Sequence, residues 1–255
     1  MRIVSYNILD GGEGRADPLA EVILAQKPDL VALVEAGNLD VLERIGKRLD
    51  MDYIQAEGAG EHAVALYSRW PIVQSINHGV VRGTPRCLLE VLVRRPDGPE
   101  WTIGVTHLHP RASEPDEAER EQELGSLLDI FKPHRDRKQP HILCGDLNAN
   151  SPIQQIDPDK VKARTREAWE ANGGQIPRRV IQRLLDEGYL DSLHAVRGEE
   201  AGRMYSFTTQ ETGQRIDYIF TWGIDRAKLT AAWIEQDRLA KYASDHYPVG
   251  LEVAG

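Results

Sequence analysis

Apolar, strand-like runs in this chain repeatedly end in a polar residue that can bind a metal ion or a phosphate group. An acid or a histidine at the end of a buried strand is costly unless it is paired or coordinated. Several such residues in one chain indicate that one shared cation or hydrogen-bond network neutralises them. The residues at these run ends are Asn7, Glu35, His107, Asp146 and Asn148.

The C-terminal part of the chain adds three residues of the same kind. Asp217 lies inside the apolar run 216–221, and Asp245 and His246 directly precede the last apolar run, 247–253. A histidine paired with an acid is held in one orientation, and when protonated it supplies positive charge. The candidate site therefore draws on residues from almost the whole length of the chain.

The spacing of apolar residues predicts strands that alternate irregularly with helices. Helices are expected over 17–27, 39–49, 115–131 and 177–187, where apolar residues fall on one stripe. Strands are expected over the runs 2–8, 29–34, 53–56, 63–68, 72–76, 87–95, 101–108, 140–145, 216–221, 229–234 and 247–253. This order favours an α+β or layered α/β fold with a mixed sheet over a strict βαβ repeat.

Charge and composition narrow the classes of protein that remain. The chain has 255 residues, with 31 Lys and Arg against 40 Asp and Glu, which gives a net charge of −9. It therefore lacks the general positive charge that attracts polyphosphate at long range, although a local basic patch or a bound cation can still recruit a phosphate. The proportions of 41% hydrophobic and 28% charged residues exclude disordered, collagen-like and disulfide-built chains.

The length of the chain, and its lack of targeting signals and of a membrane span, lead to three expectations. We expect one domain over residues 1–255, with an irregular polar insertion at about 150–176. No run approaches the roughly 20 apolar residues of a membrane span, and the N-terminus lacks the features of a signal peptide. We therefore expect a cytoplasmic protein with no stable membrane association and with buried free thiols at Cys87 and Cys144. The oligomeric state is not predicted.

The residue types in this set suit the hydrolysis of a phosphoester. A phosphodiester is anionic, so a hard cation such as Mg²⁺, held by carboxylate oxygens, offsets its repulsion of an attacking water. A carboxylate must also orient and deprotonate that water. Amide groups and a histidine can hold the phosphate oxygens.

With this set of residues, the sequence resembles the endonuclease/exonuclease/phosphatase superfamily. Its members include DNase-type nucleases, abasic-site endonucleases, deadenylases, tyrosyl-DNA phosphodiesterases, neutral sphingomyelinases and inositol-polyphosphate phosphatases. Any one of the motifs alone is a weak signal, but six in the family's order, from Asn7 to His246, are specific. They are Tyr6-Asn7, Glu35, Thr106-His107-Leu108, Gly145-Asp146-Leu147-Asn148, Ile216-Asp217-Tyr218-Ile219 and Ser244-Asp245-His246.

The resemblance implies a fold and a cofactor. The family fold is a four-layer α/β sandwich, in which two mixed, mostly antiparallel sheets pack face to face with helices outside. The family also implies Mg²⁺ or Mn²⁺, with Glu35 as the main ligand, assisted by Asn7 and by Asp245.

The resemblance further implies a role for each catalytic residue. Asp146 would position or deprotonate the water, and Asn148 would hold that water and the phosphate. His246, oriented by Asp217, would bind the scissile phosphate. His107 would contact the phosphate or assist the leaving oxygen.

Three positions depart from the family pattern. The residue two places after Asn7 is Leu9, with Asp10 one place out of register, and this puts a second metal ligand in doubt. Val34 stands where a Gln usually precedes the glutamate. Gln214 stands where abasic-site enzymes carry a Trp, and this puts a pocket for an abasic sugar in doubt.

Other residues allow either a functional or an ordinary interpretation. Arg86, His109 and Arg111 are candidate substrate contacts, but surface arginines are usually only solvated. The sequence fits His109 equally well as a packed histidine beside His107. Residues 157–183 include seven Lys and Arg residues and four acids, which gives this stretch a local charge of +3. This stretch is either a rim that meets an anionic substrate or a solvated helix face.

We therefore predict a metal-dependent phosphoester hydrolase, with a nuclease or DNA-repair-type phosphodiesterase as the first candidate. Its partner would be a phosphoester substrate, with nucleic acid as the main possibility. The alternative is a hydrolase of a small phosphorylated metabolite or a lipid headgroup. A non-catalytic binding module is the third possibility, but such a protein would be expected to have lost Glu35, Asp146 or His246.

Overall fold

The computed structural model of this chain describes residues 1–58, 63–79, 87–96 and 98–254. They form two six-stranded mixed sheets. The first sheet has the order β11 (Leu229–Ile234), β12 (Val249–Val253), β1 (Arg2–Asn7), β2 (Leu30–Val34), β4 (Ala63–Ser68) and β3 (Asp52–Glu57). The second has the order β5 (Ile72–Asn77), β6 (Cys87–Arg94), β7 (Glu100–His107), β8 (His141–Asp146), β10 (Asp217–Trp222) and β9 (Leu190–Asp191).

The two sheets share one pairing pattern. Each has a single parallel pair at its centre, β1 with β2 in the first sheet and β7 with β8 in the second, and antiparallel pairs on both sides. Strands of a parallel pair end at the same edge, and their antiparallel neighbours begin there. Across the sandwich, β1 packs against β8, and β2 packs against β7 and β8. The ends of these four central strands therefore lie close together.

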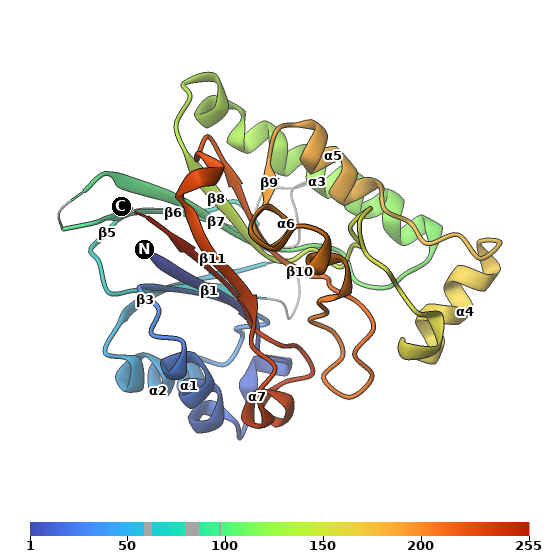
Figure 1. The fold of residues 1–255 in the computed structure, drawn as a ribbon. Coiled ribbons are helices and arrows are strands. Elements are labelled where there is room, and N and C mark those ends of the chain that lie inside the picture. Colours follow the sequence, from blue (N-terminus) through green and yellow to red (C-terminus); the bar gives the residue numbers. More distant parts are fainter. Residues whose placement is uncertain (59–62, 80–86, 97, 255) are drawn as a thin grey trace.

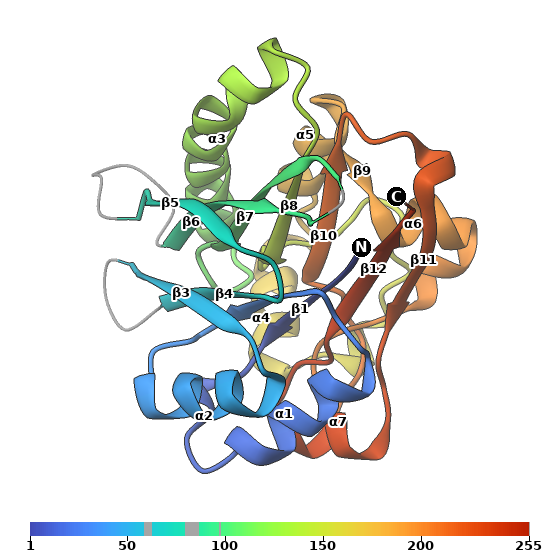
Figure 2. The same ribbon diagram turned by 90° about the vertical axis from the view of Figure 1, so that its left-hand side faces the viewer.

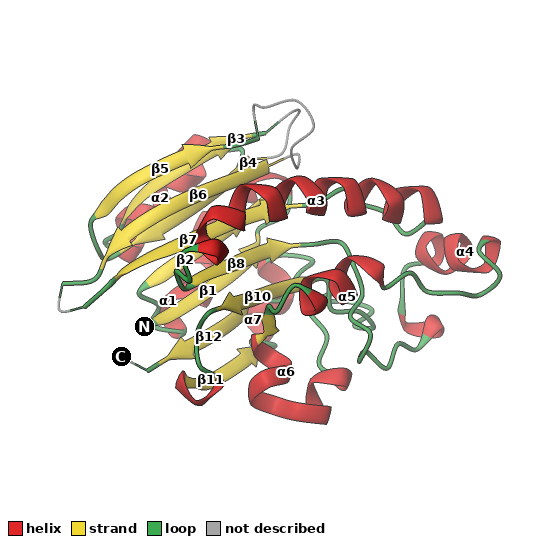
Figure 3. Ribbon diagram, turned by 90° about the horizontal axis from the view of Figure 1, so that it is seen from above, coloured by secondary structure: helices red, strands yellow, loops and turns green. Residues whose placement is uncertain are grey.

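Helices cover the outer faces of both sheets (Figures 1 and 2). On the first sheet, α1 (Ala16–Ala25) packs against α2 (Leu39–Leu49) and α7 (Arg238–Ala243). On the second, α3 (Glu114–Asp136) packs against α5 (Arg179–Asp186) and crosses the sheet, as Figure 3 shows from above. The short α6 (Ser192–Arg197) packs on β10 and β11. The result is a four-layer α/β sandwich, which confirms the fold class predicted from the sequence.

The core follows from the alternation of side chains along the strands. One cluster fills the space between the sheets and beneath α1 and α2, and a second lies between α3, α5 and the outer face of the second sheet. Leu124, Leu127, Leu128 and Phe131 form the buried stripe of α3. Ser113 and Asp116 cap this helix through a reciprocal capping box. Cys87 and Cys144 are buried free thiols, as predicted.

All eleven predicted strands and the four predicted helices are present, most of them with shifted ends. The first helix begins at Ala16, with Arg15 at its N-cap position, and α3 continues past residue 131 to Asp136 although it contains Pro133. Three helices and one strand were missed. Each of α6 and α7 has only six residues, and β9 has two, so no apolar period can show in them.

The polar stretch 150–176 contains a 3₁₀ helix, Pro158–Lys160, and α4 (Ala163–Ala171), which was also missed. Only Thr165 and Trp169 are buried in α4. Figures 1 and 3 show that α4 projects beyond the sandwich, at the end of the molecule opposite the two termini. No helix among the described residues is long and apolar enough to cross a membrane.

Candidate active site

The central edges of the two sheets bring the predicted residues together. Asn7 is the last residue of β1, and Glu35 directly follows β2. His107 is the last residue of β7, and Asp146 is the last residue of β8. The neighbouring strands begin at the same edge, because Asp217 pairs with Asp146 in the antiparallel β8–β10 register. Residues far apart in sequence therefore meet because of the sheet topology.

The Asp146 carboxylate lies at the centre of this group and is buried. Its Oδ1 accepts a hydrogen bond from the backbone N–H of Asn148 at 2.9 Å, and its Oδ2 accepts one from Nδ2 of Asn7 at 3.1 Å. Nε2 of His107 and Nε2 of His246 lie 3.7 and 3.8 Å from the same Oδ2. One carboxylate oxygen thus faces an amide and two imidazoles.

Gly145 explains how β8 delivers this carboxylate. Its φ is +138°, and a Cβ at this position would lie 1.9 Å from the carbonyl oxygen of Thr106 on β7. No other residue fits this close approach of two backbones. The glycine of the Gly-Asp-Leu-Asn motif is therefore a packing requirement of the site.

Glu35 adopts a left-handed backbone conformation, with φ of 59°, which is uncommon outside glycine. Its Oε2 accepts a hydrogen bond from the backbone N–H of Asp10 at 2.8 Å, and its Oε1 accepts one from Nδ2 of Asn7 at 3.1 Å. Asn148 is also left-handed, with φ of 48°. Such backbone conformations concentrate at functional sites, where the surroundings hold them in place.

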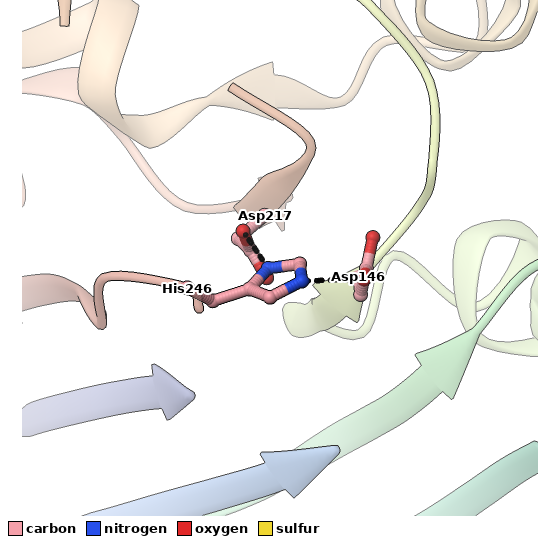
Figure 4. A group of neighbouring side chains, drawn as sticks. All are labelled: Asp146, Asp217 and His246. Atoms are coloured by element: carbon pink, nitrogen blue, oxygen red, sulfur yellow. Dashed lines mark hydrogen bonds and ion pairs between the residues drawn. The ribbon is translucent and has the colours of Figure 1, made fainter. Parts of the chain in front are cut away.

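His246 is buried between two carboxylates (Figure 4). Its Nδ1 lies 2.9 Å from Oδ2 of Asp217, and its Nε2 faces Asp146. The hydroxyl of Ser206 donates to the same Asp217 oxygen at 2.6 Å. Asp217 therefore holds the imidazole in one orientation, as the sequence analysis anticipated, and Ser206 was not identified as its partner.

The surroundings raise the pKa of one carboxyl group and of one imidazole above their ordinary values. Burial, and then the negative charge of Asp217, raise the pKa of Asp146 to about 7. Burial lowers the pKa of His246, but Asp217, Asp146 and Asp245 outweigh it and raise that pKa to about 10. His246 is therefore a cation at neutral pH, and Asp146 can exchange a proton there.

Asp245 contacts a residue from the polar segment. Its Oδ2 lies 3.3 Å from Nζ of Lys162, and its Oδ1 lies 3.8 Å from Nε2 of His246. The Phe207 ring packs on His246 with ring centroids 4.6 Å apart, and Lys162 lies 4.4 Å above the same Phe207 ring. Phe207 was not among the predicted site residues, and Lys162 was predicted only as part of a basic stretch.

The donor set fits a divalent cation. Ligand atoms of Asp146, Asp217 and His246 lie within 4.8 Å of one another, the only such group of three or more His, Cys, Asp or Glu residues in the described parts of the chain. A protonated imidazole has no lone pair for a metal, so this group offers a cation only its carboxylate oxygens. Glu35 and Asp146 approach the same Asn7 amide. Oδ1 of Asp245 is buried and accepts no hydrogen bond from any residue that the structure describes. Hard carboxylate oxygens of this kind suit Mg²⁺ or Mn²⁺.

The candidate substrate contacts have different locations. His109 lies beyond the end of β7, so it does not share a strand face with His107; it faces Asp116 and Glu119 of α3 at 2.9 and 3.0 Å. Arg111 has φ of 81° and lines a cavity of about 70 Å³ beside Asn148. Arg86 lies outside the described residues.

Asn148 contributes to the site in two ways. Its side-chain Nδ2 donates to the carbonyl oxygen of Leu108 at 3.0 Å, and its side chain lines the same cavity as Arg111. Gln214, which departs from the pattern of abasic-site enzymes, also lines this cavity and donates to Asn150 at 3.0 Å.

The chain is similar in sequence to one characterised nuclease over part of its length. It is 34% identical over 121 residues to an exodeoxyribonuclease from Bacillus subtilis (strain 168), an alignment that covers 46% of this chain and 45% of that protein. The chain therefore matches about half the length of this relative.

Several solved structures share the fold over the whole chain. A 3′ phosphatase, NExo, from Neisseria, bound to a product DNA hairpin, superposes with a TM-score of 0.77, 21% identity and 100% of both chains covered. An AP endonuclease from Archaeoglobus fulgidus superposes with a TM-score of 0.73, 19% identity and 99% of both chains covered.

The family assignment follows from the sequence match together with the fold. The model of the Endonuclease/Exonuclease/phosphatase family matches residues 4–246, a range that contains every residue of the site described above. The chain belongs to the endonuclease/exonuclease/phosphatase family.

Proposed function

We propose that this protein is a phosphoester hydrolase that depends on Mg²⁺ or Mn²⁺ and cleaves phosphodiesters of nucleic acid by direct attack of water. The observation that carries the proposal is the Asp146 carboxylate, with one oxygen within 3.1 to 3.8 Å of Asn7, His107 and His246. A carboxylate with a pKa of about 7, surrounded by hydrogen-bond donors, is suited to remove a proton from water at neutral pH.

The other residues of the cluster support binding and charge stabilisation. The imidazolium of His246, held by Asp217, places a positive charge where a phosphate develops negative charge. His107 and Asn148 lie beside the Asp146 carboxylate and are suited to hold phosphate oxygens. Glu35, with Asn7 and Asp245, would hold the metal ion, which when bound neutralises the phosphate and activates water.

The relatives favour nucleic acid as the substrate. The Bacillus subtilis relative is named for cleavage of DNA, and the Neisseria structure contains DNA. The proposal also takes residues 1–255 as one domain, whose polar insertion at about 150–176 would border the substrate. A protein that acts on small phosphoesters or lipid headgroups would have the same central chemistry but would not cleave nucleic acid.

A gel assay tests the proposal directly. Purified protein would be incubated with Mg²⁺ or Mn²⁺ and labelled single-stranded DNA, duplex DNA, abasic duplex and RNA. The Asp146→Ala protein, purified in parallel, controls for contaminating nucleases. Cleavage by the wild type and not by the variant is expected. Equal cleavage by both would overturn the proposal, and hydrolysis of small phosphoesters alone would favour the metabolite or lipid alternative.

A further inference from the structure

The polar segment that follows Asn150 delivers one lysine to the candidate active site. Nζ of Lys162 lies 3.3 Å from Asp245 and 4.4 Å above the ring of Phe207, which in turn packs on His246. The side chain keeps about a third of its surface exposed to solvent. Lys162 therefore stands at the border between the buried carboxylates and the solvent from which a substrate enters.

Four neighbouring basic residues contact partners other than the site residues described above. Lys160 pairs with Asp157, and Arg166 lies near Asp159 and Glu170. Beyond α4, basic side chains bind the chain itself: Arg178 donates to backbone carbonyls of Ser151 and Gln154, and Arg179 pairs with Glu114 and Glu121.

Arg164 is the second basic side chain of the segment that lies near the site. It lines the cavity of about 70 Å³ beside Asn148, together with Thr165 and Trp169 from the same segment. Residues of the segment thus line the space next to Asn148, and Lys162, two residues before Arg164, contacts Asp245 of the site.

The charge of the cluster explains why a lysine is needed there. Glu35, Asp146, Asp217 and Asp245 together carry four negative charges when ionised. A divalent cation supplies two positive charges and the His246 imidazolium supplies a third, so one more is required before the site is neutral. Lys162 supplies it, and without this lysine an incoming phosphate meets a more negative site.

We propose that Lys162 is a specificity-determining residue that binds the phosphate of the substrate, and that it extends the site's range from the phosphodiester of the proposed function to a doubly charged phosphate at the end of a nucleic acid strand, which it binds more tightly than a singly charged phosphate within the strand. The Coulomb energy scales with the charge on the phosphate, so the lysine contributes more to binding the terminal group. This inference rests on the proposed function for its substrate, and on the Lys162 contacts for its residue.

Equilibrium binding tests the inference without turnover. The probe is one short fluorescein-labelled oligonucleotide, ending in either a 3′-phosphate or a 3′-hydroxyl, titrated by anisotropy against Asp146→Asn protein in Mn²⁺. Adding Lys162→Met should weaken binding of the phosphate-ended probe about tenfold, or about 1.4 kcal/mol, and that of the hydroxyl-ended probe about threefold. Lys162→Arg should restore most of the difference, because it keeps the charge.

Lys160→Met is the matched control, since it removes a lysine from the same segment whose partner lies away from the site. It should change both affinities by less than about twofold. A purely structural role for Lys162 predicts a lower melting temperature and equal losses for both probes. Equal losses, or losses no larger than those of Lys160→Met, would overturn the inference.

The two proposals can fail separately. Wild type that cleaves no nucleic acid in the gel assay, while Lys162→Met still shows the contrast between probes, overturns the proposed function and keeps Lys162 as a phosphate-binding residue. Wild type that cleaves, with no contrast between probes, keeps the function and removes Lys162 from substrate selection.

Discussion

Arg215 and Asp217 stand two residues apart in one segment but enter two different kinds of buried charge cluster. Arg215 donates two hydrogen bonds to Asp191, at 2.8 and 2.6 Å, and both side chains are buried. Asp191 also caps α6 through the backbone N–H of Leu193. In this closed cluster one positive charge meets one negative charge in a bidentate geometry.

The open cluster of Asp146, Asp217 and His246 lacks this balance. Two buried carboxylates share one imidazole, and Nε2 of His246 stays 3.8 Å from Asp146, too far for a hydrogen bond. A balanced pair is neutralised within the fold, whereas a buried group with excess negative charge is suited to bind something positive. The difference separates charges that the fold itself neutralises from those that we propose to be functional.

Removal of the acid from the closed cluster should have the largest effect on stability. Asp191→Ala leaves the Arg215 guanidinium buried without its partner, so we expect a loss of about 3–5 kcal/mol in the free energy of unfolding. Urea denaturation measures it, with Asp129→Ala on the exposed face of α3 as the control, at less than about 0.5 kcal/mol. A small loss for Asp191→Ala would show that the closed cluster contributes little to the fold.

Asp146→Asn should affect the open cluster in the opposite way. The catalytic rate should fall at least about a hundredfold, the scale of a lost general base. Stability of the metal-free protein at pH 8 should rise, because a carboxyl whose pKa is raised on folding costs free energy above its unfolded pKa. Single-turnover cleavage and thermal melting measure the two effects. A marked loss of stability would place Asp146 among the structural charges.

Divalent metal should stabilise the protein through Glu35, Asn7 and Asp245, which lie beside the open cluster. At a Mg²⁺ concentration about a hundred times the dissociation constant, the wild type should gain about 2.7 kcal/mol. Glu35→Gln should weaken metal binding and so reduce this gain in stability. Asp191→Asn should leave the gain unchanged, although the protein itself is less stable. Melting curves with and without chelator test this. An equal gain for wild type and Glu35→Gln would contradict the role of Glu35.

His141 should give the smallest effect on stability. It is a buried histidine whose two ring nitrogens both have hydrogen-bond partners. Its Nδ1 faces the carbonyl oxygen of Gln139 at 3.0 Å and its Nε2 faces the Tyr189 hydroxyl at 2.8 Å, which suits the neutral ring. Burial lowers its pKa to about 4. The unfolded chain then binds more protons, so this contribution is present above about pH 6.5 and is lost as the pH falls toward 4.

Between pH 8 and pH 5 the wild type should therefore lose about 2 kcal/mol more than His141→Gln. Urea denaturation at the two pH values measures the difference. Equal pH dependence for both proteins would show that His141 does not stay neutral in the folded state.

Much of the site could be predicted because polar residues follow apolar runs. The ends of β1, β2, β7 and β8 carry Asn7, Glu35, His107 and Asp146, and each is visible as a change from apolar to polar in the sequence. The order of the motifs then identified the family, and through it the four-layer sandwich.

The supporting contacts could not be predicted in this way. Ser206 and Phe207 lie in an irregular stretch whose sequence shows no period, and they reach Asp217 and His246 only through the folded loop. His109 was expected beside His107, but β7 ends between them and the chain turns toward α3. Lys162 resembles its basic neighbours in sequence and differs from them only in its contacts.

The sequence by itself determined which residues have the chemistry for phosphoester hydrolysis and which runs of the chain become strands, because side-chain type and apolar period are local properties. Tertiary structure alone decided which charges balance. The parallel pairs β1–β2 and β7–β8 bring distant strand ends to one edge, and the short loops beyond them decide whether an acid meets an arginine or another acid. Charge balance depends on distances in space, and distances between residues far apart in sequence exist only once the sheets have packed.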